Sequence, residues 1–322
     1  MIILSSVIKL RPRLAASLRL GWFAGFGLLG LAGPVRAQTF LTLNLPNLSA
    51  PPGALAISHL SDGRFVYGNG NALYLQNSFG AAATTSFATP PGVDPSFVTV
   101  LNDTTAVVGA GGGFGPSSIY QFNPSNPATP GYTAITSLQN YLGAPAGGTS
   151  LYVVGANGSG TNIFDGPTSA VSYVTTGGTQ QILVDNAGGF SSGVAVDAGG
   201  NLFVGDDDTS SVYKFTAAQV ANAITHATTL SFTDGTLVHT FAADVVGSLA
   251  VDGQGRIWAA GFGASGLYWF DPSTNLGGSL DPQDGADNPN GLYSVSAFSA
   301  NGNDYVSYVF QSGFSNGSSV IY

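Results

Sequence analysis

The stretch Ser192-Gly-Val-Ala-Val-Asp-Ala-Gly-Gly-Asn-Leu-Phe-Val-Gly205 returns in a second version as Gly247-Ser-Leu-Ala-Val-Asp-Gly-Gln-Gly-Arg-Ile-Trp-Ala-Ala260. The two copies align at a constant offset of 55 residues, and the alignment continues into the aromatic residues that follow. The aligned pairs are Val194/Leu249, Asp197/Asp252, Gly200/Gly255, Phe203/Trp258, Tyr213/Tyr268 and Phe215/Phe270. A period near 50 residues with turn-linked strands is typical of repeated β-sheets around an axis. The repeat therefore predicts an all-β fold.

The first copy shows the plan of one repeat unit, because alternating apolar residues are bounded by turn-forming residues. It predicts four strands and, in the segment Thr216–His226, a short helix inserted between the third and the fourth of them. The predicted parts are a first strand Val194–Val196, a turn Asp197–Gly200, a second strand Leu202–Val204, a loop Gly205–Ser210, a third strand Val212–Phe215 and a fourth strand Thr236–Phe241.

The same plan recurs along the chain, with first strands beginning near residues 54, 97, 140, 193, 248 and 293. The other expected strands are Ala54–Ser58, Phe65–Tyr67 and Leu73–Leu75, then Phe97–Val100, Ala106–Val108 and Ile119–Phe122, then Leu151–Val154 and Ile163–Phe164, and finally Tyr293–Phe298, Tyr305–Phe310 and Val320–Tyr322. Six units with spacings of 43 to 55 residues predict a six-bladed β-propeller. An open β-sandwich and a parallel β-helix are the alternatives, although a β-helix would have shorter repeats.

Closure of the propeller is predicted to use the N-terminal strand. The last unit has three strands up to Tyr322, while Thr39–Leu45 has no hairpin partner of its own. Thr39–Leu45 is therefore expected as the outer strand of the last blade, where it would cover two exposed sheet edges. Residues 38–322 are expected to form a single β-propeller domain.

Residues 1–37 have the pattern of a signal peptide. Lys9, Arg11, Arg13 and Arg19 precede the apolar stretch Leu20–Leu31, and Val35-Arg36-Ala37 supplies small residues at −3 and −1 of a cleavage point before Gln38. An uncleaved membrane anchor is the alternative, but the apolar run is shorter than the roughly 18 residues that a span needs. We therefore expect a secreted, periplasmic or cell-surface protein, cleaved near Ala37.

The charge of the exported part excludes several classes of partner. After residue 37 only Arg64, Lys214 and Arg256 are basic, against all 17 acidic residues, so the net charge is −14. Such a chain is not expected to bind nucleic acid or an anionic membrane. Every acidic residue is Asp and cysteine is absent, which excludes mechanisms that need a glutamate or a thiol.

The segment Ala195-Val-Asp-x-x-Gly-Asn-Leu-Phe-Val204 resembles the repeats of NHL-repeat and gluconolactonase-like six-bladed propellers, including exported bacterial ones. The resemblance covers the exported chain as architecture, and residues 192–215 and 247–273 as a sharp motif. It implies that a gluconolactonase-like enzyme would hold a divalent metal in the channel through a glutamate, with Asn and Asp from later blades. This chain has no glutamate for that position.

Candidate ligand-binding residues lie in the loops between the second and third strands, which gather at one mouth of a propeller. Asp197 and Asp252 lie in the opposite turns, where an Asp side chain accepts from backbone N–H groups and the following glycines take a positive φ. In the loops, Asp206 and Asp208 are candidate calcium ligands, since adjacent carboxylates repel one another unless a cation or solvent screens them. A solvated loop is the alternative. The ligand-binding candidates are Asn69, Asn71, Asn157, Asp206, Asp207 and Asp208.

A second acidic cluster, Asp281, Asp284 and Asp287, is a candidate for an irregular calcium loop or for a solvated connection between blades. It lacks the ligand spacing of an EF-hand. The three histidines share no metal-binding spacing, and His59 is expected in a turn, His226 in the helical insert and His239 in an outer strand.

The leading hypothesis from the sequence is a monomeric binding or scaffold module without a catalytic set, which takes a protein or glycan ligand through its loop face. The alternative is a metal-dependent lactonase or lyase that uses Asp and Asn residues in the channel. A structural matrix component is a third hypothesis, and it predicts neither a ligand nor turnover.

Overall fold

The computed structural model describes residues 56–69, 72–76, 84–88, 95–110, 116–139, 141–143, 146–147, 150–156, 169–187, 193–206, 208–242, 247–260, 267–280, 292–300, 303–312 and 318–321. The chain divides into two units, Met1–Leu43 and Asn44–Tyr322, and every described residue belongs to the second. In these ranges, helix is limited to α1 (Ala217–His226) and the 3-10 turn η2 (Phe232–Asp234). The all-β class is confirmed.

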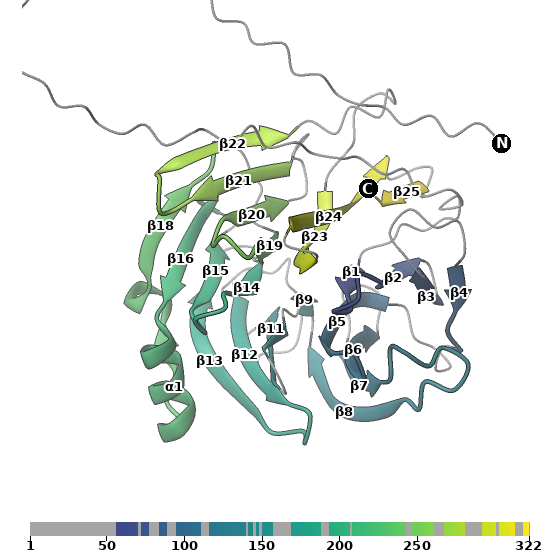
Figure 1. Cartoon of the computed structure of the whole chain (residues 1–322). Coiled ribbons are helices and arrows are strands. Elements are labelled where there is room, and N and C mark those ends of the chain that lie inside the picture. The colour runs from purple at the N-terminus through teal and green to yellow at the C-terminus, as the bar shows by residue number, and fades with distance from the viewer. Residues whose placement is uncertain are drawn as a thin grey trace, which may run out of the picture. The chain divides into compact units, whose positions relative to one another are not determined.

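The described strands form six hydrogen-bonded sheets in chain order, here called the first to the sixth sheet (Figure 1). Four of them have four antiparallel strands in sequence order. The first sheet has β1 (Ala56–His59), β2 (Phe65–Asn69), β3 (Ala72–Gln76) and β4 (Thr84–Ser86); the second has β5 (Pro95–Asn102), β6 (Thr105–Ala110), β7 (Pro116–Phe122) and β8 (Thr133–Gln139). The fourth has β14 (Val194–Val196), β15 (Leu202–Asp206), β16 (Ser211–Phe215) and β18 (Thr236–Thr240); the fifth has β19 (Ser248–Val251), β20 (Ile257–Ala260), β21 (Leu267–Asp271) and β22 (Leu276–Leu280).

The third sheet is larger than predicted. It contains β9 (Tyr141–Gly143), β10 (Ala146–Gly147), β11 (Ser150–Ala156), β12 (Ser169–Thr175), β13 (Gln180–Ala187) and β17 (Leu230–Ser231). Strand β17 follows α1 in the insert of the fourth sheet and pairs in parallel with β13, where Val184 lies opposite Leu230. The predicted strand Ile163–Phe164 lies outside the described residues, and β12 and β13 were not predicted.

The sixth sheet has three strands among the described residues, β23 (Leu292–Ala300), β24 (Asn303–Ser312) and β25 (Ser318–Ile321). The strand predicted to complete it, Thr39–Leu45, lies outside the described residues.

The inner strands of successive sheets lie next to one another, from β1 and β5 through β10, β14 and β19 to β23, and β1 also contacts β23. The core lies between neighbouring sheets. One cluster joins Val184 of the third sheet to Phe215 of the fourth, and another joins Phe203 of the fourth to Ile257 of the fifth. Because neighbours cover both faces of the middle strands, β15 and β20 are buried at every position. Antiparallel sheets packed in this cyclic order define a β-propeller.

Backbone contacts between inner strands set the spacing of the sheets. The hydroxyls of Ser58 and Ser248 each accept from a backbone N–H of the next sheet, Val100 at 2.9 Å and Val295 at 3.1 Å. At the corresponding position of the fourth sheet stands Gly193, where a Cβ would lie 2.7 Å from the Leu249 nitrogen. A glycine is needed there because the two backbones approach too closely for a side chain.

Helix α1 occupies the segment for which a short helix was predicted. Thr216 and Gln219 form a reciprocal capping box, with the Gln219 N–H donating to Thr216 Oγ1 and the Thr216 N–H donating to Gln219 Oε1. The helix buries Val220 and Ala223 in the cluster between the third and fourth sheets. The Gln181 amide of β13 donates to two backbone carbonyls, Ala223 at 3.1 Å and Thr228 at 2.9 Å, so the insert joins these sheets.

Candidate functional site

The acidic triplet lies at the end of β15 and in the β15–β16 loop, where the structure describes Asp206 and Asp208. Asp206 is the last residue of β15 and is 8% exposed. Its Oδ1 accepts from the Asp208 N–H at 3.1 Å, and its Oδ2 accepts from the Thr209 hydroxyl at 2.6 Å. Both carboxylate oxygens of Asp206 therefore hold the loop in shape.

The rest of this loop is tied to the outer strand of the same sheet. Ser210 has a φ of 54°, and its carbonyl accepts from the Phe241 N–H at 2.8 Å. The hydroxyls of Ser211 and Thr240 lie 2.8 Å apart. Asp206 is buried and bonded within the loop, whereas the side chain of Asp208 is exposed. The loop therefore presents the Asp208 carboxylate to solvent.

The structure places few of the other predicted site residues. Asn69 is the last residue of β2, without a described side chain, and Asn71, Asn157, Asp207, Asp281, Asp284 and Asp287 lie outside the described residues. Across the described ranges, no three His or Asp side chains are grouped so that they could hold a metal ion. The calcium hypothesis therefore stays a prediction.

The turns opposite the loop face have the predicted form. Gly200 and Gly255 have φ values of 78° and 81°. Asp252 Oδ1 accepts from the N–H of Gln254, two residues on, at 3.0 Å. In both turns the same oxygen accepts from the N–H four residues on, which is Arg256 at 3.0 Å for Asp252 and Asn201 at 2.9 Å for Asp197. Both Asp residues are turn-formers.

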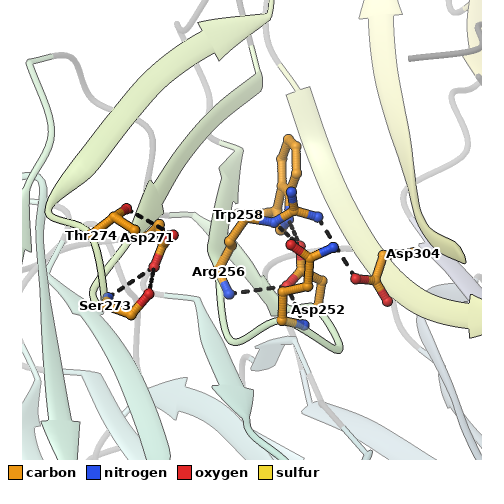
Figure 2. Close-up of polar contacts among 8 residues, drawn as sticks. Asp252, Arg256, Trp258, Asp271, Ser273, Thr274 and Asp304 are labelled. Atoms are coloured by element: carbon orange, nitrogen blue, oxygen red, sulfur yellow. Dashed lines mark hydrogen bonds and ion pairs between the residues drawn. The ribbon is translucent and has the colours of Figure 1, made fainter. Parts of the chain in front are cut away.

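Asp252 also organises a buried polar group, the Arg256 cluster, which consists of Asp252, Arg256, Trp258 and Asp304 (Figure 2). Asp252 Oδ2 accepts from Arg256 Nε at 2.5 Å and from Trp258 Nε1 at 2.8 Å. The guanidinium lies over the Trp258 ring and extends to Asp304 of β24 at 3.9 Å. Asp252 and Arg256 are 6% and 7% exposed. The cluster joins the fifth and sixth sheets, and its polar groups bind one another.

A second polar cluster was missed by the sequence prediction. His59 is not in a turn; it is the last residue of β1 and pairs with Phe65 in the ladder. Its Nδ1 lies 3.1 Å from Ser296 Oγ, and its Nε2 lies 3.0 Å from Ser307 Oγ. Burial lowers the pKa of His59 to about 3. A sequence signal for this contact is absent because the serines are 237 and 248 residues away.

Hydrogen bonds from serine hydroxyls lower the pKa of two further carboxyl groups, those of Asp103 and Asp271. The Ser61 hydroxyl donates to Asp103 at 2.5 Å and lowers the pKa of that carboxyl. The Ser273 hydroxyl has the same effect on the pKa of Asp271, at 2.7 Å (Figure 2). Hydrogen bonds to the ionised form account for both shifts. Ser61 and Asp103 belong to different sheets, so this contact also joins neighbours.

The fold thus defines a β-propeller, and comparison with solved structures agrees. A luciferin-regenerating enzyme has a TM-score of 0.60 at 12% identity, over 87% of this chain and 94% of that chain. Regucalcin from Agrobacterium tumefaciens, a calcium-binding protein, has a TM-score of 0.59 at 10% identity, over 87% and 92%. A structure of a nidogen–laminin complex gives 0.57 at 11% identity, over 76% and 84%.

Identities this low show a common fold alone, because one fold carries many unrelated functions. No protein-family model matches the sequence, and a search of the curated proteins gives no match either. In the described part of the chain, no helix has the length and apolar content that a membrane crossing needs.

Proposed function

We propose that this protein is an exported β-propeller that binds a protein or glycan ligand through its loop face. The observation that carries the proposal is the contrast between frame and loops in the fourth and fifth sheets. Their strands and turns correspond at the offset of 55 residues, whereas the loops read Gly205-Asp-Asp-Asp-Thr-Ser210 and Ala260-Gly-Phe-Gly-Ala-Ser265. A repeated rigid frame with variable loops is the usual arrangement of a binding protein.

The proposal includes the complete architecture and the cellular location. We infer six blades, with Thr39–Leu45 closing the last one, since the described part of the sixth sheet has three strands where the first and fifth sheets have four. Export follows from the pattern of residues 1–37 and places the domain 38–322 in the periplasm, at the cell surface or outside the cell. We expect a monomer.

The proposed ligand contacts include Asp208, which is exposed in a loop that Asp206 holds in place. A carboxylate on a net-negative surface favours a ligand that carries positive charge or binds through calcium. Two structures with the same fold, a calcium-binding regucalcin and one in a nidogen–laminin complex, are precedents for calcium binding and for a protein partner on this fold.

The test is a binding screen of the purified protein on protein and glycan arrays, with calcium and with a chelator. Asp208→Ala should weaken a captured ligand at least several-fold, while its backbone N–H still donates to Asp206. Asp62→Ala is the matched control, because Asp62 is equally an exposed Asp but lies in a β1–β2 turn, away from the β15–β16 loop. Equal loss in both variants would contradict loop-face binding.

The competing function is a metal-dependent lactonase or lyase. Steady turnover in a lactone screen that a chelator abolishes would replace the binding proposal with that one. Export has a separate test, which is the N-terminal sequence of the protein recovered outside the cytoplasm. We expect it to begin at Gln38; an intact Met1 in the cytoplasm would contradict export without affecting the binding result.

A further inference from the structure

His59 lies at the contact between the first and the last described sheets, here called the β1–β23 seam. The imidazole stacks on Phe298 of β23, with ring centroids 3.8 Å apart and planes inclined by 16°. Phe65 of β2 lies on another side, at 5.6 Å. Among the described strands, no ladder hydrogen bonds join the first sheet to the sixth, and His59 contacts β23 and β24 through side chains.

The hydrogen bonds of His59 suit a neutral ring. A neutral imidazole has one donor and one acceptor nitrogen, and a serine hydroxyl can serve either of them. Ser296 Oγ and Ser307 Oγ lie at 3.1 and 3.0 Å, so both nitrogens are satisfied within the described residues. Ser307 is 5% exposed, which keeps water from this side of the ring.

The charged groups on the surrounding elements are committed to other partners. Asp62, in the turn after β1, pairs with Arg64 at 2.7 Å, and Asp103, after β5, accepts from Ser61. Asp304 of β24 lies 3.9 Å from Arg256. The remaining titratable groups on β2 and β24 are the phenols of Tyr67, Tyr305 and Tyr308. Tyr67 lies tilted against Phe65 and stacks on Tyr74, and Tyr305 stacks on Phe298. The described contacts of His59 are with the hydroxyls of Ser296 and Ser307 and with the rings of Phe65 and Phe298.

We propose that His59 makes the β1–β23 seam acid-sensitive, so that protonation of its imidazole separates the first sheet from the sixth. An imidazolium ion would be buried between Phe298 and Phe65 with two neutral hydroxyls and no paired carboxylate. Such an ion is costly, and opening the seam returns it to water.

Linkage gives the direction and the range of the effect. Burial depresses the pKa of His59 from 6.5 to about 3. The closed state therefore binds this proton more weakly than the open state, and closure loses stability as the pH falls below 6.5, down to about 3. Between pH 7 and pH 5 one such histidine shifts the open-to-closed ratio by about 25-fold.

His239 offers an internal comparison. It belongs to β18 of the fourth sheet and stacks on Phe270 of the fifth, at 3.9 Å and 10°, so it has the same kind of aromatic contact across a different seam. Burial lowers the pKa of both rings, which are partly exposed, but the shift is smaller at His239 than at His59. Substitution of His239 should therefore remove a smaller part of the acid response.

The test measures hydrogen exchange at pH 7 and pH 5 in the purified protein, corrected for the intrinsic rate. Histidine is the side chain whose ordinary pKa lies in this range, and the chain has neither Glu nor Cys. Protection of β1 and β23 should fall about 25-fold relative to β20, and H59Q should abolish that fall. An unchanged acid response in H59Q would overturn the proposal, as would full protection at pH 5.

H239Q is the matched control and should retain most of the response at the β1–β23 seam. If H59Q fails to fold at pH 7, NMR titration of the wild-type imidazoles decides instead. Of the three histidines, one should remain neutral below pH 5. If all three titrate near 6.5, the proposal is wrong.

Discussion

The fourth and fifth sheets contain the same turn with different partners. Asp197 holds Asn201, whose Oδ1 then accepts from the Ala217 N–H at the start of α1, at 3.0 Å. Asp252 holds Arg256, which extends to Asp304 in the sixth sheet (Figure 2). One exchange at the aligned position, Asn201 for Arg256, therefore directs the first turn toward the inserted helix and the second toward the neighbouring sheet.

The two turns also differ in how deeply their side chains are buried. Asp197 and Asn201 are partly exposed, whereas Asp252 and Arg256 are buried together with Trp258. A buried ion pair gains little over an apolar replacement, but removal of one partner leaves a desolvated charge. Removal of the turn aspartate should therefore destabilise the protein much more at Asp252 than at Asp197, and this difference can be measured.

Asp252→Ala should have the largest effect. The change removes the acceptor of four hydrogen bonds and leaves the Arg256 guanidinium buried with only Asp304 at 3.9 Å. We expect the free energy of unfolding to fall by about 3–5 kcal/mol. Asp197→Ala should cost only about 1–2 kcal/mol, since its partners can reach water. Urea unfolding of both variants provides the measurement, and equal losses would remove the distinction between the turns.

Gly193→Ala should rank second. Its Cβ would lie 2.7 Å from the Leu249 nitrogen and 2.8 Å from the Ser248 backbone, which is closer than a real contact allows. Forcing β14 and β19 apart should cost about 1–3 kcal/mol. The matched variant is Ser248→Ala at the aligned position of the fifth sheet, which loses the acceptor of the Val295 N–H and should cost about 1 kcal/mol. A neutral Gly193→Ala would show that the two strands can separate freely.

Local patterns predicted most of the fourth and fifth sheets. Strand alternation, the Asp and Gly of each turn and the apolar pattern of the helical insert all act within a few residues, so they can be read from the sequence. The pairing of β17 with β13 could not be predicted, because a two-residue strand carries no periodicity and its partner lies in the preceding unit.

Contacts between distant residues account for the other misses. His59 was expected in a turn, but it pairs with Phe65 as the last residue of β1, and its side chain contacts Ser296 and Ser307 at the far end of the chain. The partnership of Arg256 with Asp304 likewise depends on which sheets are neighbours. Of the candidate site, the structure describes Asp206 at the end of β15 and Asp208 in the loop after it, while the acidic cluster from Asp281 to Asp287 lies outside the described residues.

Asn201→Ala sharpens the comparison on the side of the fourth sheet. The variant loses the donor to Asp197 Oδ2 at 2.7 Å and the acceptor of the Ala217 N–H. We expect a loss of about 1 kcal/mol, concentrated in α1. Hydrogen exchange should show faster exchange in α1 and little change in β20. A uniform change in both elements would argue that Asn201 does not act on the helix.

Asp62→Ala should have the smallest effect, although its ion pair resembles that of Asp252. In the β1–β2 turn Asp62 accepts from the Arg64 N–H at 3.0 Å and from Arg64 Nε at 2.7 Å, but the two side chains are 50% and 26% exposed. Water and salt screen an exposed pair, so the loss should stay below about 1 kcal/mol. It should shrink further in 1 M NaCl, whereas the loss for Asp252→Ala should change little because that pair is buried. Urea unfolding at low and high salt compares the two variants directly. Should Asp62→Ala cost as much as Asp252→Ala, burial would not be what separates the two pairs, and the contrast between the turns would have to come from geometry alone.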